Sequence, residues 1–126
     1  MSIVHCVCLP FPPTTNNLFR HGWVDGKPRR FSSARAKSWG RTALQIIGYD
    51  RTLPKPIRTP VTIEIALTAP DRRRRDASNY IKAVEDALVK ARVLTDDSHL
   101  VVRSITSRWE EPSRKDAGVK VTIRAA

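Results

Sequence analysis

The chain has 126 residues, with 23 lysines and arginines against 12 aspartates and glutamates, and a formal net charge of +11. That length fits one domain, and 40% apolar residues suffice for one core, which excludes a chain that is disordered throughout. So strong a positive field attracts polyanions, with nucleic acid as the leading partner and an acidic membrane surface second. We expect no membrane partner, because no apolar run approaches the ~20 residues of a membrane span and no basic amphipathic helix with large exposed apolar residues supports binding to a membrane surface.

The N-terminal residues 2–9 are apolar on both alternating faces, which predicts a strand that is covered on both sides. We expect Cys6 and Cys8 to be buried thiols, because two cysteines on one face of a strand are badly placed to bridge each other. Reduced thiols, and an opening without the features of a signal peptide, indicate a cytoplasmic setting. Residues 14–31, which follow a proline-rich break, are interpreted as a long polar loop, and such loops are more often functional than idle.

Two elements follow this loop. Ser32 or Ser33 is a candidate cap for a helix that runs to about Ile47, with Gly48 as its stop. After a connector, residues 61–68 alternate between apolar and polar side chains, which predicts a half-buried strand.

The second half of the chain contains one more helix and two more strands. Apolar residues recur at helical spacing over roughly 77–91, and strands are indicated at 100–109 and 118–124. The order is therefore β-α-β-α-β-β. We predict a single α+β domain over residues 1–126, with a mixed sheet packed by two helices.

Acidic and basic side chains gather around the second helix. Four consecutive arginines lie between Asp71 and Asp76, and Asp96 and Asp97 follow the helix. One polar face of the helix carries, at spacings of three and four, Ser78, Lys82 and Glu85/Asp86. Hard cations such as Mg²⁺ take carboxylate ligands, and a lysine nearby stabilises charge on a reacting phosphate. The pattern therefore indicates a metal-dependent nuclease whose arginines grip phosphate.

Each part of this pattern also has a simpler interpretation. Asp76 could be a helix cap with no further role. Lys82 and Asp86 could form an ordinary surface ion pair. The Asp96–Asp97 pair could form a turn before a strand. The arginine run could be a phosphate-binding rim without catalysis, and a small RNA-binding protein would then be a further class, against which the clustered aspartates count.

The stretch PDRRRRD…N…K…DAL…DD, from Pro70 to Asp97, resembles the RusA family of Holliday junction resolvases. The opening segment LPFPPTTNNLFRH, from Leu9 to His21, is similar to the start of that family. Together with the length and the element order, the resemblance covers nearly the whole chain. It implies a RusA-like endonuclease domain over residues 1–126.

The resemblance also implies an activity. Members are homodimeric endonucleases, often carried by phages, that bind four-way DNA junctions and nick two opposing strands in recombination and repair. They need Mg²⁺, for which Mn²⁺ can substitute. By position in the family motif, Asp76 and Asp97 match metal-binding aspartates, Asp96 matches their acidic neighbour, and Lys82 matches an important lysine. The positions that match DNA-contacting segments are Asn16, Asn17, Arg20, Arg72, Arg73, Arg74, Arg75 and Asn79.

One position departs from the family pattern. The middle aspartate of the family's metal site is Ser78 here, and a neutral hydroxyl is a weaker Mg²⁺ ligand than a carboxylate. Ser78 could hold a metal-bound water while Asp86, the nearest acid by spacing, fills the gap, with Glu85 and Asp71 as further candidates. The alternative is a non-catalytic protein that binds junctions without cutting them.

Overall fold

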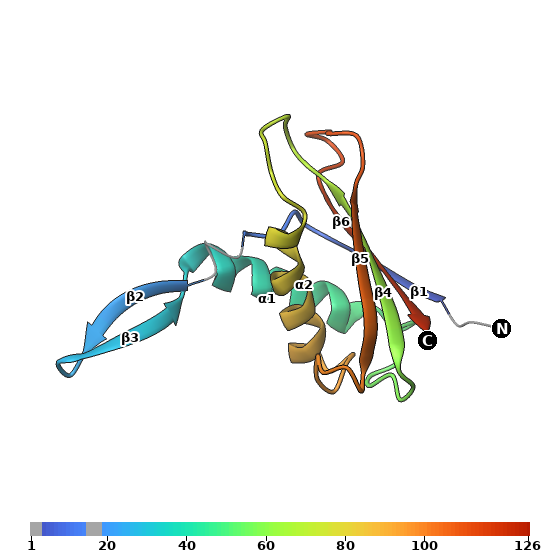
Figure 1. Cartoon of the computed structure of the whole chain (residues 1–126), viewed down its shortest axis with the longest axis horizontal. Coiled ribbons are helices and arrows are strands. Elements are labelled where there is room, and N and C mark those ends of the chain that lie inside the picture. Colours follow the sequence, from blue (N-terminus) through green and yellow to red (C-terminus); the bar gives the residue numbers. More distant parts are fainter. Residues whose placement is uncertain (1–3, 15–18) are drawn as a thin grey trace.

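The structure is a computed structural model, and it describes residues 4–14 and 19–126. Within these residues, two helices and six strands follow one another (Figure 1). In chain order they are β1 (Val4–Leu9), β2 (Phe19–Val24), β3 (Lys27–Ser32), α1 (Ala34–Tyr49), β4 (Val61–Thr68), α2 (Ser78–Lys90), β5 (Val102–Trp109) and β6 (Gly118–Ala125).

The main sheet has four strands in the order β1-β6-β4-β5. β4 is parallel to β5, whereas β6 is antiparallel to both β1 and β4, so the sheet is mixed. The parallel pair is possible because α2 provides the crossover between β4 and β5. The predicted α+β class with a mixed sheet and two helices is thereby confirmed.

Both helices pack on one face of this sheet (Figure 1). Alternate residues of β4 point into the core from Val61 to Leu67 and are almost fully buried, as the alternation predicts. Ala43 and Ile47 of α1 and Val84 and Leu88 of α2 complete the same cluster. The other face of the sheet is polar and open to solvent. The helices on the covered face determine where the residues of the candidate site lie.

The prediction for the first strand is wrong on one point. Cys6 and Cys8 are exposed free thiols, whereas Val7 and Leu9 are buried. β1 lies at the edge of a sheet that has helices on one face only, so alternate residues of β1 face solvent. The cysteines lie on that open face, where Cys6 Sγ is 3.6 Å from the hydroxyl of Thr122.

The predicted loop over residues 14–31 is also wrong over most of its length. The chain forms a hairpin of β2 and β3 that projects away from the sheet (Figure 1). Asp25 and Gly26 connect the strands with φ of 52° and 74°, which is the backbone of a tight hairpin turn with a matching twist. Asp-Gly between two strand-length segments was the sequence signal that indicates this hairpin.

The helices agree well with their sequence signals. Ser33 caps α1, because its Oγ accepts from the backbone N–H of Ala36 at 3.1 Å. Gly48 does not stop this helix, which ends at Tyr49 with Asp50 as its C-cap. α2 lies within the predicted range. Neither helix in the described part of the chain combines the length and apolar character that a bilayer crossing requires.

Candidate nuclease site

The arginine run forms a loop between β4 and α2 that is fastened by Asp71. Arg75 Nη1 donates to Asp71 Oδ1 at 2.8 Å, and the backbone N–H of Arg73 donates to the same oxygen at 3.0 Å. The Arg75 hydrogen bond, followed by that from Arg73, lowers the pKa of Asp71 to about 2. Asp71 is therefore committed to the loop, which makes it a poor candidate for the missing metal ligand.

The four arginines do not have equal surroundings. The Arg75 side chain is 15% exposed and lies over the ring of Phe11, 5.5 Å from its centroid. Phe11 in turn packs against Tyr80 and Trp109, so Arg75 is anchored on an aromatic cluster. The other three, Arg72, Arg73 and Arg74, are exposed. Arg75 thus anchors the loop on the aromatic cluster, and the other three guanidinium groups face solvent.

Asp76 lies at the start of α2 with an exposed side chain. The capping position of α2 is Ala77, and among the described residues no side chain caps this helix end by a hydrogen bond. The interpretation of Asp76 as a simple cap is therefore wrong, which leaves its carboxylate available for another role. Ser78 is exposed in the first turn, and Asn79 is half-buried behind it.

The polar face of α2 carries the next two groups. Lys82 Nζ lies 3.3 Å from Asp86 Oδ1, so the surface ion pair considered from the sequence is present. Glu85 is half-buried, and its pKa is raised, first by burial and then by the negative charge of Asp97. Asp86 raises it further, while Lys82 opposes the shift. Asp86 and Asp97 therefore both lie within electrostatic reach of Glu85.

The two aspartates after α2 differ in their roles. Asp96 Oδ1 accepts from the backbone N–H of Ser98 at 2.7 Å, and hydrogen bonds from Ser98 lower the pKa of Asp96. This arrangement is the turn that the sequence offered as an alternative, and it applies to Asp96 alone. Asp97 remains exposed beside it.

Asp76 and Asp97 belong to segments at opposite ends of α2 (Figure 1). The 13 residues of this helix span about 20 Å. Within the described parts of one chain, no group of three or more histidine, cysteine, aspartate or glutamate side chains is arranged to hold a metal ion. One chain therefore collects Glu85, Asp86 and Asp97 near the C-terminal half of α2, and leaves Asp76 at the other end.

The opening segment is only partly described. Asn16 and Asn17 lie outside the described residues. Arg20 lies in β2, where its backbone pairs with Phe31. The structure thus places this expected DNA contact in the projecting hairpin and away from α2 (Figure 1).

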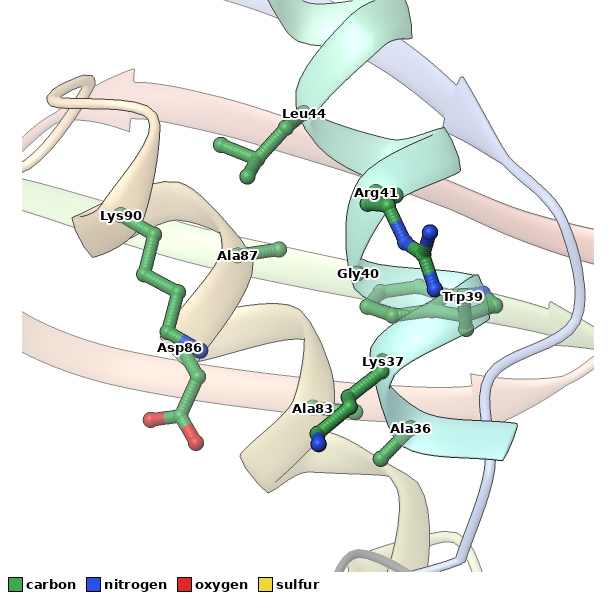
Figure 2. Close-up of a pocket in the computed structure, with 10 residues that line it drawn as sticks. All are labelled: Ala36, Lys37, Trp39, Gly40, Arg41, Leu44, Ala83, Asp86, Ala87 and Lys90. Carbon is green, nitrogen blue, oxygen red and sulfur yellow. The ribbon is translucent and has the colours of Figure 1, made fainter. Parts of the chain in front are cut away.

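A groove of about 320 Å³ lies between α1 and α2 (Figure 2). Small residues from both helices form its floor, with Gly40 on α1 facing Ala83 and Ala87 on α2. Charged side chains stand at its rim: Lys37, Arg41, Asp86 and Lys90. This groove was not predicted from the sequence. Its sequence signal is the pair of small residues four positions apart on each helix, Ala36 and Gly40 on α1 and Ala83 and Ala87 on α2.

A guanidinium-rich loop and an acidic group on one helix define a protein that acts on a polyanion. Residues 10–124 match the family model described as endodeoxyribonuclease RusA. The chain is 36% identical over 119 residues to the crossover junction endodeoxyribonuclease RusA of Escherichia coli (strain K12), covering 94% of this chain and 92% of the relative. It is 37% identical over 117 residues to the protein of the same name from Enterobacteria phage 82, covering 93% and 91%. The chain belongs to the RusA family of endodeoxyribonucleases.

Proposed function

We propose that this endonuclease resolves four-way DNA junctions during recombination and repair, by nicking two opposing strands as a Mg²⁺-dependent homodimer. The setting would be the cytoplasm of a bacterium, with the gene of host or phage origin. The observation that carries the proposal is the arrangement of α2, which has exposed arginines before its first turn and an acidic group near its far end. The relatives are named crossover junction endodeoxyribonucleases, which supports a junction as the substrate.

The arginine loop is the phosphate grip of this proposal. Arg72, Arg73 and Arg74 are exposed and adjacent, so they can neutralise successive phosphates and release counterions. Such contacts read the backbone and carry no base sequence, so a junction would be recognised by shape. Fixing the loop through Asp71 lowers the entropic cost of ordering it on DNA.

The acids fit a hard divalent cation by their chemistry but not by their positions in one chain. Asp76, Asp97 and Glu85 offer the carboxylate oxygens that Mg²⁺ prefers. α2 separates Asp76 from Asp97 within the protomer. Two copies with their α2 helices side by side and antiparallel would place Asp76 of one protomer near the Asp97 end of the other. We therefore propose that each metal site is shared between protomers.

The groove between α1 and α2 suits this dimer. Its small residues allow a partner helix to approach closely, and Leu44 on its edge is 36% exposed (Figure 2). Lys37 and Arg41 of α1 stand across the groove from Asp86 of α2, so a two-fold contact would bring Asp86 of one copy close to these cations of the other. The proposed occupant of the groove is a second copy of this chain.

Within the assembled site, the residues of the chain would divide the work. The arginine loop would hold the phosphates that flank the scissile bond, and Lys82 would stabilise the negative charge that develops on the attacked phosphate. Asp76, Asp97 and Glu85 would hold the cation, which supplies an activated water and charge stabilisation when bound. Glu85 fits this role better than Asp71, because burial and then nearby acids raise its pKa, and a cation would relieve the repulsion between these acids.

Ser78 favours one competing function, a junction-binding protein that does not cut. The exposed hydroxyl at the start of α2 stands where a carboxylate would complete the acidic set. In that case the wild type binds a junction without nicking it, and Ser78→Asp nicks. Competition between junction DNA and structured RNA separates both functions from an RNA-binding protein.

The direct test is a synthetic four-way junction incubated with the protein, with and without Mg²⁺. Paired nicks that require the cation are the expected result, whereas equal cutting of a linear duplex would contradict junction selectivity. The shared site needs a second experiment, in which Asp76→Asn and Asp97→Asn, each inactive alone, are mixed and allowed to exchange subunits.

If sites are shared, one site of the mixed dimer carries both asparagines and the other carries none. The mixture should then recover nicking, at one strand per junction. If each site is built within one protomer, both sites of the mixed dimer carry one asparagine and the mixture stays inactive. Subunit exchange is verified with differently tagged chains, so an inactive mixture is interpretable.

A further inference from the structure

The β2–β3 hairpin contains the most exposed tryptophan of the described chain. Trp23 is 75% exposed, whereas Trp39 is 9% exposed and donates from Nε1 to the carbonyl of Pro10 at 2.9 Å. Trp109 is 36% exposed and packs on the aromatic cluster beside the arginine loop. Trp39 and Trp109 therefore have structural roles, whereas the indole of Trp23 faces solvent.

The position of Trp23 is defined by the hairpin. It lies next to the last residue of β2, pairs with Pro28 across the two strands, and stands beside the tight Asp25–Gly26 turn. Two-residue turns with positive φ at both positions fix the register of the strands they join. Trp23 thus lies near the turn of the β2–β3 hairpin, an arm that projects from the body of the protein (Figure 1).

The charges of the arm indicate its partner. Residues 19–32 contain four lysines and arginines against the single acid Asp25. Lys27 and Arg29 are exposed on the opposite face of the hairpin from Trp23, because they pair with Val24 and Gly22, whereas the exposed His21 shares the face of Trp23. A flat apolar ring on an arm of net positive charge matches single-stranded or unstacked nucleic acid, where aromatic rings stack on bases and cations neutralise the backbone.

We infer that Trp23 stacks on a base at the branch point of the junction and so provides part of its selectivity over linear duplex. This inference rests on the proposed function. Within a duplex both faces of a base are stacked on neighbours, so an indole must displace one of them. At the point where strands cross, the stack is interrupted and a base face is available at lower cost. A cation-only arm would bind both forms of DNA alike.

The test uses Ca²⁺ in place of Mg²⁺ to prevent cutting, and 2-aminopurine either at the branch point or in the middle of a duplex. Trp23→Ala should bind the junction about tenfold more weakly and abolish the fluorescence change at the branch point. Duplex affinity should stay within about twofold. Trp23→Phe should retain part of both effects. The matched control is Tyr49→Ala, which removes an aromatic ring that is 84% exposed at the end of α1.

The outcomes separate this inference from the proposed function. A wild type that binds junction and duplex equally contradicts the proposed function. A wild type that prefers the junction, with the same preference in Trp23→Ala, contradicts only the stacking inference. Equal loss for both DNAs would show that the arm contacts phosphate alone. A monomeric Trp23→Ala in sedimentation would show that the indole contacts a second copy, which also overturns the inference.

Discussion

The two ends of α2 carry opposite charges and are built in different ways. Before the helix, Asp71 and Arg75 fasten an arginine loop onto an aromatic cluster. Near its C-terminal half, Asp86 and Asp97 lie within electrostatic reach of Glu85, and Lys82 offsets part of this repulsion. The arginine loop is held by contacts within one chain, whereas burial and the neighbouring acids raise the pKa of Glu85 at the acidic end. This difference indicates that DNA binding and catalysis have different requirements.

Removal of one acid should have the largest effect, because it should abolish nicking and leave junction binding intact. Asp97→Asn removes an anionic ligand while the arginine loop is unchanged, so nicking should fall at least about a hundredfold with binding preserved. Nicking and mobility-shift assays on one junction measure both quantities. Asp116→Asn, an exposed acid in the β5–β6 turn, is the control and should cut normally. Normal cutting by Asp97→Asn would remove this residue from the site.

Removal of the exposed arginines should instead weaken DNA binding and its dependence on salt. Arg73→Ala with Arg74→Ala removes two phosphate contacts, so affinity at 0.1 M salt should fall about eightfold for each. The slope of log affinity against log salt should become shallower by about 0.9 per contact. Arg58→Ala, an exposed arginine between α1 and β4, is the matched control. An unchanged slope would mean that the loop does not touch the backbone.

The dimer would bring the two ends together, and Gly40 offers a way to block it. A Cβ at Gly40 or at Gly48 would meet no described atom within 4 Å, so both positions accept a side chain. Gly40→Gln should fill the groove, weaken dimerisation about tenfold and lower nicking with it. Gly48→Gln changes the same helix outside the groove and should leave both unchanged. Sedimentation velocity measures the assembly, and a fully dimeric Gly40→Gln would exclude the groove as the contact.

The smallest expected effect concerns the order of the arginine loop. Asp71→Asn keeps an acceptor but removes the charge, so amide exchange at Arg73 should rise about tenfold. Asp50→Asn changes an equivalent turn at Thr52 and is the control. In the wild type the Asp71 pKa lies near 2, below its usual 3.8, so this contribution is present above pH 3.8 and is lost as pH falls through about 2. An Asp71 carboxyl that titrates near pH 3.8 by NMR would show that Asp71 does not hold the arginine loop through Arg75 and Arg73.

Much of the fold could be predicted because its signals are local. The alternation over Val61–Thr68 and the apolar spacing of the second helix depend on side-chain periodicity, which one sheet face and one core enforce directly. Ser33 was found as a cap for the same reason. The hairpin was missed because prolines and polar residues suggested a loop, although Asp25–Gly26 supplied the turn. Cys6 and Cys8 were misjudged because the order of strands in a sheet is not a local property.

For the candidate site, the sequence by itself determined the residue types: an arginine run, aspartates on both sides of one helix, a lysine between them and a serine in place of an acid. Only the tertiary structure decided their relations. In the structure Asp71 accepts a hydrogen bond from Arg75, and Glu85 lies within electrostatic reach of Asp97. Asp76 lies at the other end of α2. The physical reason is that charge interactions depend on distances through space, and a rigid helix of about 20 Å sets those distances regardless of how near the residues lie in the chain.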